Sequence, residues 1–206
     1  MTKINTIIFD LGGVLIDWNP EYVFLEVFNG DREKMRWFLE HICTSDWNEN
    51  QDTGYPIAQA TEDLVKQHPQ YEKEIRLFYG DWERMLGGAI QGTVDILKKL
   101  IDSKQYKVVA LTNWSAETFP IAQEKFDFLQ WFEGILVSGE ENTRKPFEDI
   151  YKLTLSRFNI EADKAIFIDD NLRNIEAANK LGIHGIHFTS AENLKDQLKN
   201  YNIQLS

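Results

Sequence analysis

Short apolar runs recur along the chain, and each is bounded by polar or turn-forming residues. Residues 4–9, 107–111, 134–137, 165–168 and 183–188 are rich in β-branched side chains, which predicts five buried strands. Residues 93–101, 147–158 and 171–181 carry apolar side chains at helical spacing, which predicts helices between the later strands. Strands that alternate with helices predict an α/β fold, with a parallel sheet covered on both faces.

Residues 17–92 interrupt this alternation. They contain no clear strand pattern, whereas residues 20–28, 31–42, 56–68 and 71–86 have helical patterns. Pro20 and Pro56 stand near two of the predicted helix starts, where proline is favoured. We therefore expect an all-helical cap, residues 17–92, inserted into a core made of residues 1–16 and 93–206.

Net charge, the length of apolar runs and the cysteine count limit which partners and which cellular compartment we expect. The net charge of −11 over 206 residues argues against nucleic acid or an anionic membrane as the main partner, because both attract basic surfaces. No apolar run is long enough to span a bilayer, and the first residues lack a signal-peptide pattern. Cys43 is the only cysteine and cannot form an internal disulfide, which favours a reducing, cytoplasmic setting. No protein partner is implied.

Polar side chains follow three of the predicted strands where each strand ends. Asp10 follows the first strand, Thr112 and Asn113 follow the second, and Asp169 and Asp170 follow the fourth. In a parallel α/β sheet the ligand lies at the carboxyl ends of the strands. We therefore expect these side chains to converge.

Each of these groups suits phosphoryl chemistry, and each also has a simpler interpretation. The Asp10 carboxylate can attack phosphorus, although Asp-x-Gly is also common in turns. The Thr112 hydroxyl can hold a phosphoryl oxygen or cap the next segment. Asp169 and Asp170 repel each other, so a bound cation is expected, and oxygen ligands favour Mg²⁺ over Zn²⁺. The alternative is an acidic turn capped by Asn171.

Lys145 precedes Pro146 where a helix is predicted to open. A cation is electrostatically disfavoured at a helix N-terminus, so a lysine there is expected to face an anion. A solvated lysine beside Glu140 and Glu141 is the open alternative. A carboxylate, a hydroxyl, an ammonium and an acidic pair together make up the parts for metal-assisted phosphoryl transfer.

Four ordered motifs carry a resemblance to a known family. Residues 9–14 (FDLGGV), 111–115 (LTNWS), 144–146 (RKP) and 167–171 (FIDDN) resemble the signature motifs of the haloacid dehalogenase-like (HAD) hydrolase superfamily. The resemblance covers essentially the whole chain, including a cap inserted after the first motif. It implies a Rossmann-like core with a C1-type helical cap. It also implies a Mg²⁺-dependent phosphomonoesterase that acts on a small phosphorylated metabolite through an aspartyl-phosphate.

The resemblance also implies roles for the motif residues. Asp10 matches the nucleophile and a metal ligand, and the backbone carbonyl of Gly12 would be a second ligand. Asp170 matches the main metal carboxylate, and Asp169 matches a supporting one. The remaining site candidates are the phosphate-binding pair Thr112 and Lys145, and the substrate-binding set Leu11, Gly12, Asn113, Trp18, Trp47 and Asp52. For the cap members of that set, packing or a turn is the alternative to a sugar contact.

The first motif departs from the usual pattern at Gly12. Most phosphatases of the superfamily have a second aspartate there, which acts as general acid and base, while the Asp-Leu-Gly sequence resembles the α-glucose-1-phosphatase-like subgroup. General acid–base catalysis contributes about 10²–10⁴-fold to a rate. Its loss matters least when the leaving group is a stable anion, so we expect a sugar phosphate, and a sugar-1-phosphate in particular. Asp17 lies beyond the turn and is a poor substitute.

Two alternatives remain open. One is a 2-haloacid dehalogenase of the same fold. Such enzymes need no metal and carry Tyr-Gly-Thr after the nucleophile, which residues 11–14 do not match. The other is a phosphate-ligand-binding protein that lost turnover when Gly12 replaced the general acid.

Overall fold

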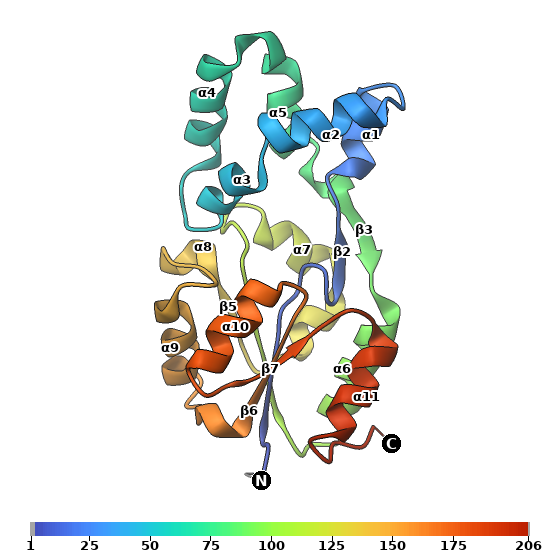
Figure 1. Cartoon of the computed structure of the whole chain (residues 1–206), viewed down its shortest axis with the longest axis vertical. Coiled ribbons are helices and arrows are strands. Elements are labelled where there is room, and N and C mark those ends of the chain that lie inside the picture. The colour runs from blue at the N-terminus through green and yellow to red at the C-terminus, as the bar shows by residue number, and fades with distance from the viewer. Residues whose placement is uncertain (1–2, 206) are drawn as a thin grey trace.

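The core is a five-stranded parallel sheet, as the sequence predicts (Figure 1). The computed structural model describes residues 3–205. The strand order is β5-β4-β1-β6-β7, with β1 in the centre. The strands are β1 (Thr6–Phe9), β4 (Lys107–Thr112), β5 (Ile135–Val137), β6 (Ala165–Asp169) and β7 (His184–His187).

The two faces of the sheet pack against different helices, because successive strand residues point to opposite sides. Ile7 and Phe9 belong to one apolar cluster, and Ile8 between them belongs to another. The first cluster includes α6 (Gln91–Asp102), α7 (Phe119–Lys125) and α11 (Ala191–Lys199). The second includes α9 (Glu148–Arg157) and α10 (Leu172–Lys180). Short helical segments complete the core: α8 (Ser138–Glu141), η3 (Asp127–Trp131) and η4 (Ala162–Lys164).

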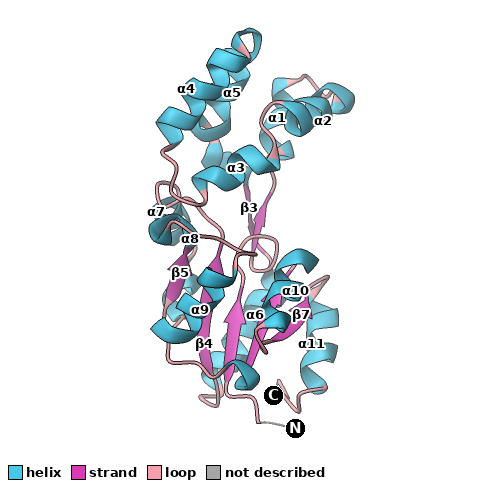
Figure 2. Ribbon diagram, turned by 60° about the vertical axis from the view of Figure 1, so that its left-hand side comes forward, coloured by secondary structure: helices cyan, strands magenta, loops and turns pink. Residues whose placement is uncertain are grey.

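A group of helices stands beyond the carboxyl ends of the strands (Figures 1 and 2). Phe24, Phe28, Phe38 and Phe78 form its centre. The ring centroid of Phe38 lies 5.1 Å from that of Phe24 and 5.4 Å from that of Phe28, and Phe78 lies 5.9 Å from Phe24. The elements are α1 (Glu21–Val27), α2 (Arg32–His41), α3 (Ser45–Gln51), α4 (Ile57–Gln67), α5 (Glu72–Gly80), η1 (Pro69–Tyr71) and η2 (Trp82–Met85).

The expectation that residues 17–92 contain no strand is wrong. β2 (Ile16–Trp18) and β3 (Leu86–Ala89) pair as an antiparallel ribbon that joins the helical group to the core. These strands are short, and Gly87 and Gly88 carry no side chain, so neither shows the alternation that marks a strand. The bounds at 17 and 92 cut through β2 and α6, and the division into two units stays a prediction.

Two helix assignments also need correction. The single helix expected over residues 71–86 ends at Gly80, and a 3-10 turn and β3 follow it. α3 was not expected, because it is short and polar. It forms because the Thr44 hydroxyl accepts a hydrogen bond from the Trp47 N–H at 3.1 Å, which caps its first turn.

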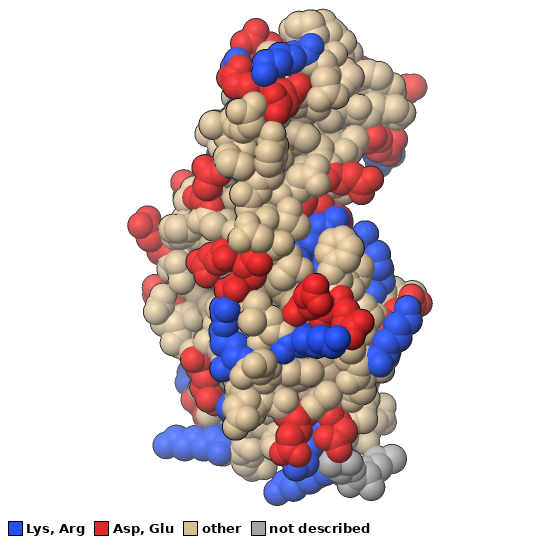
Figure 3. Space-filling view, turned by 90° about the vertical axis from the view of Figure 1, so that its left-hand side faces the viewer, with Lys and Arg blue, Asp and Glu red and all other residues tan. Residues whose placement is uncertain are grey.

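Acidic and basic side chains are mixed on the molecular surface, although the chain carries a net charge of −11. On the face shown in Figure 3, basic side chains are scattered among acidic ones and form no broad stripe. Over residues 3–205, no helix has both the length and the apolar character needed to cross a bilayer. The side chain of Cys43 is buried, and burial raises the pKa of its thiol.

Packing of the phenylalanine cluster should stabilise the helical group. Phe38→Ala removes a fully buried ring and should lower the free energy of unfolding by about 3–5 kcal/mol. Trp37→Ala on the same helix is the matched control. Its ring is 43% exposed, so its loss should cost about 1 kcal/mol or less. Urea unfolding of both variants measures the difference, and similar losses would contradict this assignment of the core.

Candidate active site

Asp10 stands at the carboxyl end of the central strand. Its N–H donates to the Ile168 carbonyl at 2.8 Å, which fixes it beside the end of β6. One carboxylate oxygen accepts the N–H of Leu11 at 2.8 Å, and the other contacts the Lys145 ammonium at 2.8 Å. Burial raises the pKa of Asp10, and the charges of Asp169 and Asp170 raise it further, against the opposing effect of Lys145. The carboxylate is therefore held close to other charges and away from bulk water.

Lys145 is completely buried and bridges two carboxylates. Its Nζ lies 2.8 Å from Asp10 and 2.7 Å from Asp169. Burial by itself would lower the pKa of Lys145, but the two carboxylates raise it, so the side chain stays charged. It faces anions, as expected, although it does not open a helix. α9 begins three residues later, at Glu148.

The segment around Lys145 is bonded to the end of β4. The Asn113 side chain donates to the Lys145 carbonyl at 3.0 Å and accepts the Lys145 N–H at 2.9 Å. This pair of bonds fixes the backbone from which the lysine extends. Asn113 therefore positions Lys145, a role that the sequence alone did not suggest.

The two aspartates after β6 occupy different environments. Asp169 is fully buried and accepts hydrogen bonds from the Asn171 N–H at 2.7 Å and from the Asn174 amide at 3.0 and 3.1 Å. Asp170 is exposed as a residue, but its carboxyl group is partly desolvated by the surrounding protein. This desolvation, together with the charge of Asp169, raises the pKa of Asp170. Ligand oxygens of Asp10, Asp169 and Asp170 all lie within 4.8 Å of one another.

The charges of the side chains around Lys145 do not balance. When ionised, the three carboxylates exceed the single Lys145 ammonium by two negative charges. Hard oxygen ligands with a net charge of this size match a divalent cation such as Mg²⁺. The donor set of the described residues therefore fits the metal that the sequence predicts.

The Thr112 hydroxyl lies at the end of β4 and is buried. Among residues 3–205, its Oγ1 has no hydrogen-bond partner. Buried hydroxyls are normally bonded, so an unpaired one beside a charged centre is a position for an oxygen-rich ligand.

The two glycines after Asp10 differ in what surrounds them. A Cβ on Gly13 would lie 2.2 Å from a carboxylate oxygen of Asp170, and its φ of +72° also disfavours a side chain. A Cβ on Gly12 would meet no atom within 4 Å. Gly13 therefore allows Asp170 to approach the first motif, whereas Gly12 leaves open space.

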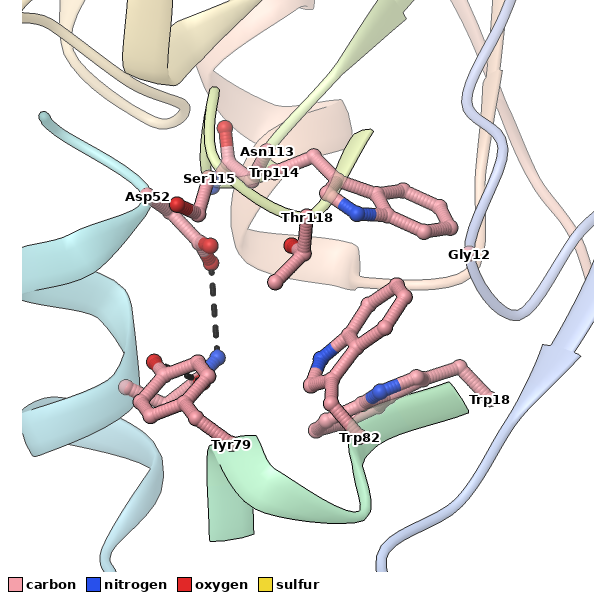
Figure 4. Close-up of a pocket in the computed structure, with 10 residues that line it drawn as sticks. Gly12, Trp18, Asp52, Tyr79, Trp82, Asn113, Trp114, Ser115 and Thr118 are labelled. Carbon is pink, nitrogen blue, oxygen red and sulfur yellow. Dashed lines mark hydrogen bonds between the residues drawn. The ribbon is translucent and has the colours of Figure 1, made fainter. Parts of the chain in front are cut away.

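A cavity extends from Gly12 toward the helical group (Figure 4). Trp114 and Trp82 meet edge to face, with ring centroids 5.5 Å apart, and Trp18 lies beside them. Within the described part of the chain, the indole N–H groups of Trp18 and Trp114 have no partner. The other lining residues are Asn48, Asp52, Tyr79, Asn113, Ser115 and Thr118.

The structure brings most of the predicted substrate contacts together, but not all. Trp18, Asp52, Gly12 and Asn113 line the cavity. Trp47 does not line it, because its ring packs against Phe78 and Tyr79, at 5.2 and 5.5 Å between centroids. The Leu11 side chain is also absent from the wall and lies in the core. Sequence reasoning missed Tyr79 and Trp82, since helical spacing alone does not say which face of a helix meets the site.

One carboxylate of the helical group is paired with two arginines of the core. Glu49, on α3, lies 2.7 Å from Arg144 and 2.7 Å from Arg173. Arg144 directly precedes Lys145, and Arg173 follows the acidic pair. Glu49 and Arg144 are largely buried, so this pair is screened less by solvent than an exposed one.

Comparisons with known proteins agree with the geometry. Residues 7–188 match the family described as haloacid dehalogenase-like hydrolase. The chain is 28% identical to a sesquiterpene phosphatase of Aspergillus oryzae over 92% of each chain. It is 21% identical to a phosphorylated carbohydrates phosphatase of Thermotoga maritima, over 89% of this chain and 84% of that protein. A Bacteroides thetaiotaomicron HAD-family enzyme, solved with magnesium and inorganic phosphate, superposes with a TM-score of 0.71 and 23% identity, covering 91% and 95% of the two chains.

The lysine bridge leads to a prediction about stability. Lys145→Met keeps the length of the side chain but leaves two carboxylates without their cation. We expect the free energy of unfolding, measured at pH 7 in EDTA, to fall by about 3–5 kcal/mol. Lys152→Met is the control, because that lysine pairs with Glu148 on the exposed surface of α9, where solvent screens the pair and its loss should leave stability nearly unchanged. An equally small effect at Lys145 would contradict the bridge.

Proposed function

The chain belongs to the haloacid dehalogenase-like hydrolases, and from this membership and the geometry of its site we propose that it is a Mg²⁺-dependent phosphomonoesterase. The proposed substrate is a small phosphorylated metabolite, and the proposed intermediate is an aspartyl-phosphate on Asp10. The observation that carries the proposal is the pair of excess negative charges around the Lys145 bridge, next to the unpaired Thr112 hydroxyl.

The residues that would hold the metal are Asp10, Asp169, Asp170 and the backbone carbonyl of Gly12. When bound there, Mg²⁺ supplies positive charge that offsets the charge of the phosphoryl group and orients it. The protein surrounds this position with fixed groups, since the Asn174 amide and the Asn171 N–H hold Asp169 in place. Such outer bonds orient the ligands of a metal.

The chain's own groups divide the work of phosphoryl transfer. A carboxylate oxygen of Asp10 attacks phosphorus, and the bond from phosphorus to the ester oxygen breaks. Lys145 offsets the charge on the transferring group, and the Thr112 hydroxyl donates to one of its oxygens. Water then attacks the phosphoaspartate, releases inorganic phosphate and restores the Asp10 carboxylate.

The cavity supports a sugar phosphate as the class of substrate. The aromatic faces of Trp18, Trp82 and Trp114 suit the apolar face of a sugar ring, while Asp52 and Asn48 offer polar partners for its hydroxyls. The related phosphatase named for carbohydrates is consistent with this class, and the one named for sesquiterpenes makes an isoprenoid phosphate the comparison to include.

Phosphate release from a substrate panel tests the proposed function. The panel contains sugar-1-phosphates, sugar-6-phosphates, farnesyl phosphate and p-nitrophenyl phosphate, each with Mg²⁺ and with EDTA. We expect release only with Mg²⁺ and at least a 10³-fold loss in Asp10→Asn, because the nucleophile is removed (order of magnitude for such groups). Halide release from 2-haloacids without Mg²⁺ would instead identify a dehalogenase. Phosphate-ligand binding without turnover would identify an inactive binding protein.

The close approach of Gly13 to Asp170 predicts a selective effect on metal binding. Gly13→Ala forces the Asp170 carboxylate away from the first motif, so the Mg²⁺ concentration for half-maximal activity should rise about 10–100-fold. Gly12→Ala is the matched control, since its methyl group enters open space and should shift the Mg²⁺ requirement far less. A Mg²⁺ titration of activity measures both, and an unchanged Mg²⁺ requirement in Gly13→Ala would argue against Asp170 as a ligand.

A further inference from the structure

We propose that Asp52 is the general acid and base of the reaction, because its carboxyl group enters, from the helical group, the same cavity that Gly12 borders. This inference rests on the proposed phosphatase function and names a residue that the motifs do not contain. Within the described chain, Asp52 is the one acidic side chain in the cavity wall. Figure 4 shows its carboxyl group directed into the cavity from the side opposite Gly12.

The backbone that carries Asp52 is fixed against the core. The Ser138 hydroxyl donates to the Asp52 carbonyl, and the same hydroxyl oxygen accepts the Trp114 N–H at 2.9 Å. Gly54 follows with a φ of +90°, and a Cβ there would lie 3.0 Å from the Gly139 carbonyl. This loop therefore lies in close contact with the segment that follows β5, and the Asp52 side chain has a defined starting point.

The Asp52 carboxyl group is held less tightly than those of the lysine bridge. It accepts a hydrogen bond from the Ser115 backbone, and its one side-chain partner in the described structure is the Asn48 amide, at 3.5 Å. Asp10 and Asp169, by contrast, each have an ammonium within 2.8 Å. Since Asp52 forms no ion pair in the described structure, its carboxyl group can exchange a proton with a group in the cavity.

The surroundings suit proton transfer near neutral pH. Burial and the neighbouring Glu49 raise the pKa of Asp52 to about 7, against the opposing charges of Arg144 and Lys145. From α5, the Tyr79 side chain also faces this region, and burial raises the pKa of its hydroxyl, which keeps it neutral. A carboxyl group with a pKa near the working pH can both donate and accept a proton.

The other nearby carboxyl groups fit the role less well. Asp17 accepts a hydrogen bond from the Tyr22 hydroxyl at 2.5 Å in an exposed position on the ribbon, and it does not line the cavity. Glu117 accepts the Ile57 N–H at 2.8 Å and also lies outside the wall. Asp17, the substitute weighed from the sequence, is therefore replaced by Asp52.

The proton balance of the two steps is complete. As Asp10 attacks phosphorus, the electron pair of the breaking bond goes to the ester oxygen, which takes the proton of Asp52 and leaves as the alcohol. The Asp52 carboxylate then takes a proton from water as that water's oxygen attacks the phosphoaspartate. The bond from phosphorus to Asp10 breaks, inorganic phosphate forms, and Asp52 is again protonated. With this acid present, substrates with poor leaving groups are accessible despite Gly12.

The test compares leaving groups in Asp52→Asn with Mg²⁺ present. For a sugar-6-phosphate, kcat/KM should fall by about 10²-fold or more, because its alkoxide needs a proton. For p-nitrophenyl phosphate, whose leaving group is a stable anion, kcat/KM should change little. Its time course should instead show a burst of p-nitrophenol, because phosphoenzyme accumulates when the base for the second step is missing. Asp46→Asn, an exposed change on α3, the helix that Asp52 directly follows, is the control for cap charge.

The pH dependence of the wild type tests the role of Asp52 without the Asp52→Asn variant, and a double variant adds a rescue test. In the wild type, kcat/KM for the sugar-6-phosphate should fall as pH rises through about 7, since the acid is lost, and the p-nitrophenyl profile should lack that limb. Gly12→Asp added to Asp52→Asn should recover the sugar-6-phosphate more than p-nitrophenyl phosphate, since its Cβ has room.

The outcomes separate the two proposals. Equal losses on both substrates in Asp52→Asn, or identical wild-type pH profiles for both, would overturn the role of Asp52 and leave the phosphatase function standing. Absence of Mg²⁺-dependent phosphate release from every substrate in the wild type would instead overturn the proposed function itself.

Discussion

The ammonium group of Lys145 holds the carboxylates of Asp10 and Asp169 at 2.8 and 2.7 Å in a fully buried position. An isolated charge would be too costly to bury there, so all three groups depend on one another. The parallel sheet makes this arrangement possible, because β1 and β6 are neighbours and end at the same level. Beside this bridge, Gly13 leaves room for the Asp170 carboxylate, so three carboxylates meet one ammonium and the site is suited to a cation.

The core was largely predictable because its signals are local. A buried strand followed by a polar residue gives both the element and the position of a site residue, as at Asp10, Thr112 and Asp169. The helical group was less predictable. The ribbon of β2 and β3 has too few side chains to show alternation, and helical spacing did not reveal that Trp47 packs inward while Tyr79 borders the cavity. The sequence indicates Asp52 as a candidate substrate contact in the cap. Its position across the cavity from Gly12 could not be predicted, because it depends on a contact between Asp52 and Ser138, which are far apart in the sequence.

The proposed metal ligands and most of the cavity wall come from different parts of the chain. The carboxylates of the proposed metal site lie at strand ends, whereas Trp18, Tyr79 and Trp82 come from residues between β1 and α6. Gly12 and the segment after β4 border both regions, and Gly12 has no side chain to fill the junction. Changes at Trp18, Tyr79 or Trp82 can thus alter the cavity without removing a partner of the lysine bridge.

The ion pairs of Glu49 with Arg144 and Arg173 would have to break if the helical group moved away from the core. Such a movement would take Glu49 away from Arg144, which is 15% exposed, and from Arg173, which is already 47% exposed, and would leave both guanidinium groups without their carboxylate. Exposed guanidinium groups raise the local concentration of anions and speed their arrival. The Arg144 and Arg173 charges that now bind Glu49 would then attract the proposed phosphorylated ligand. That ligand would therefore bind fastest while the ion pairs with Glu49 are broken.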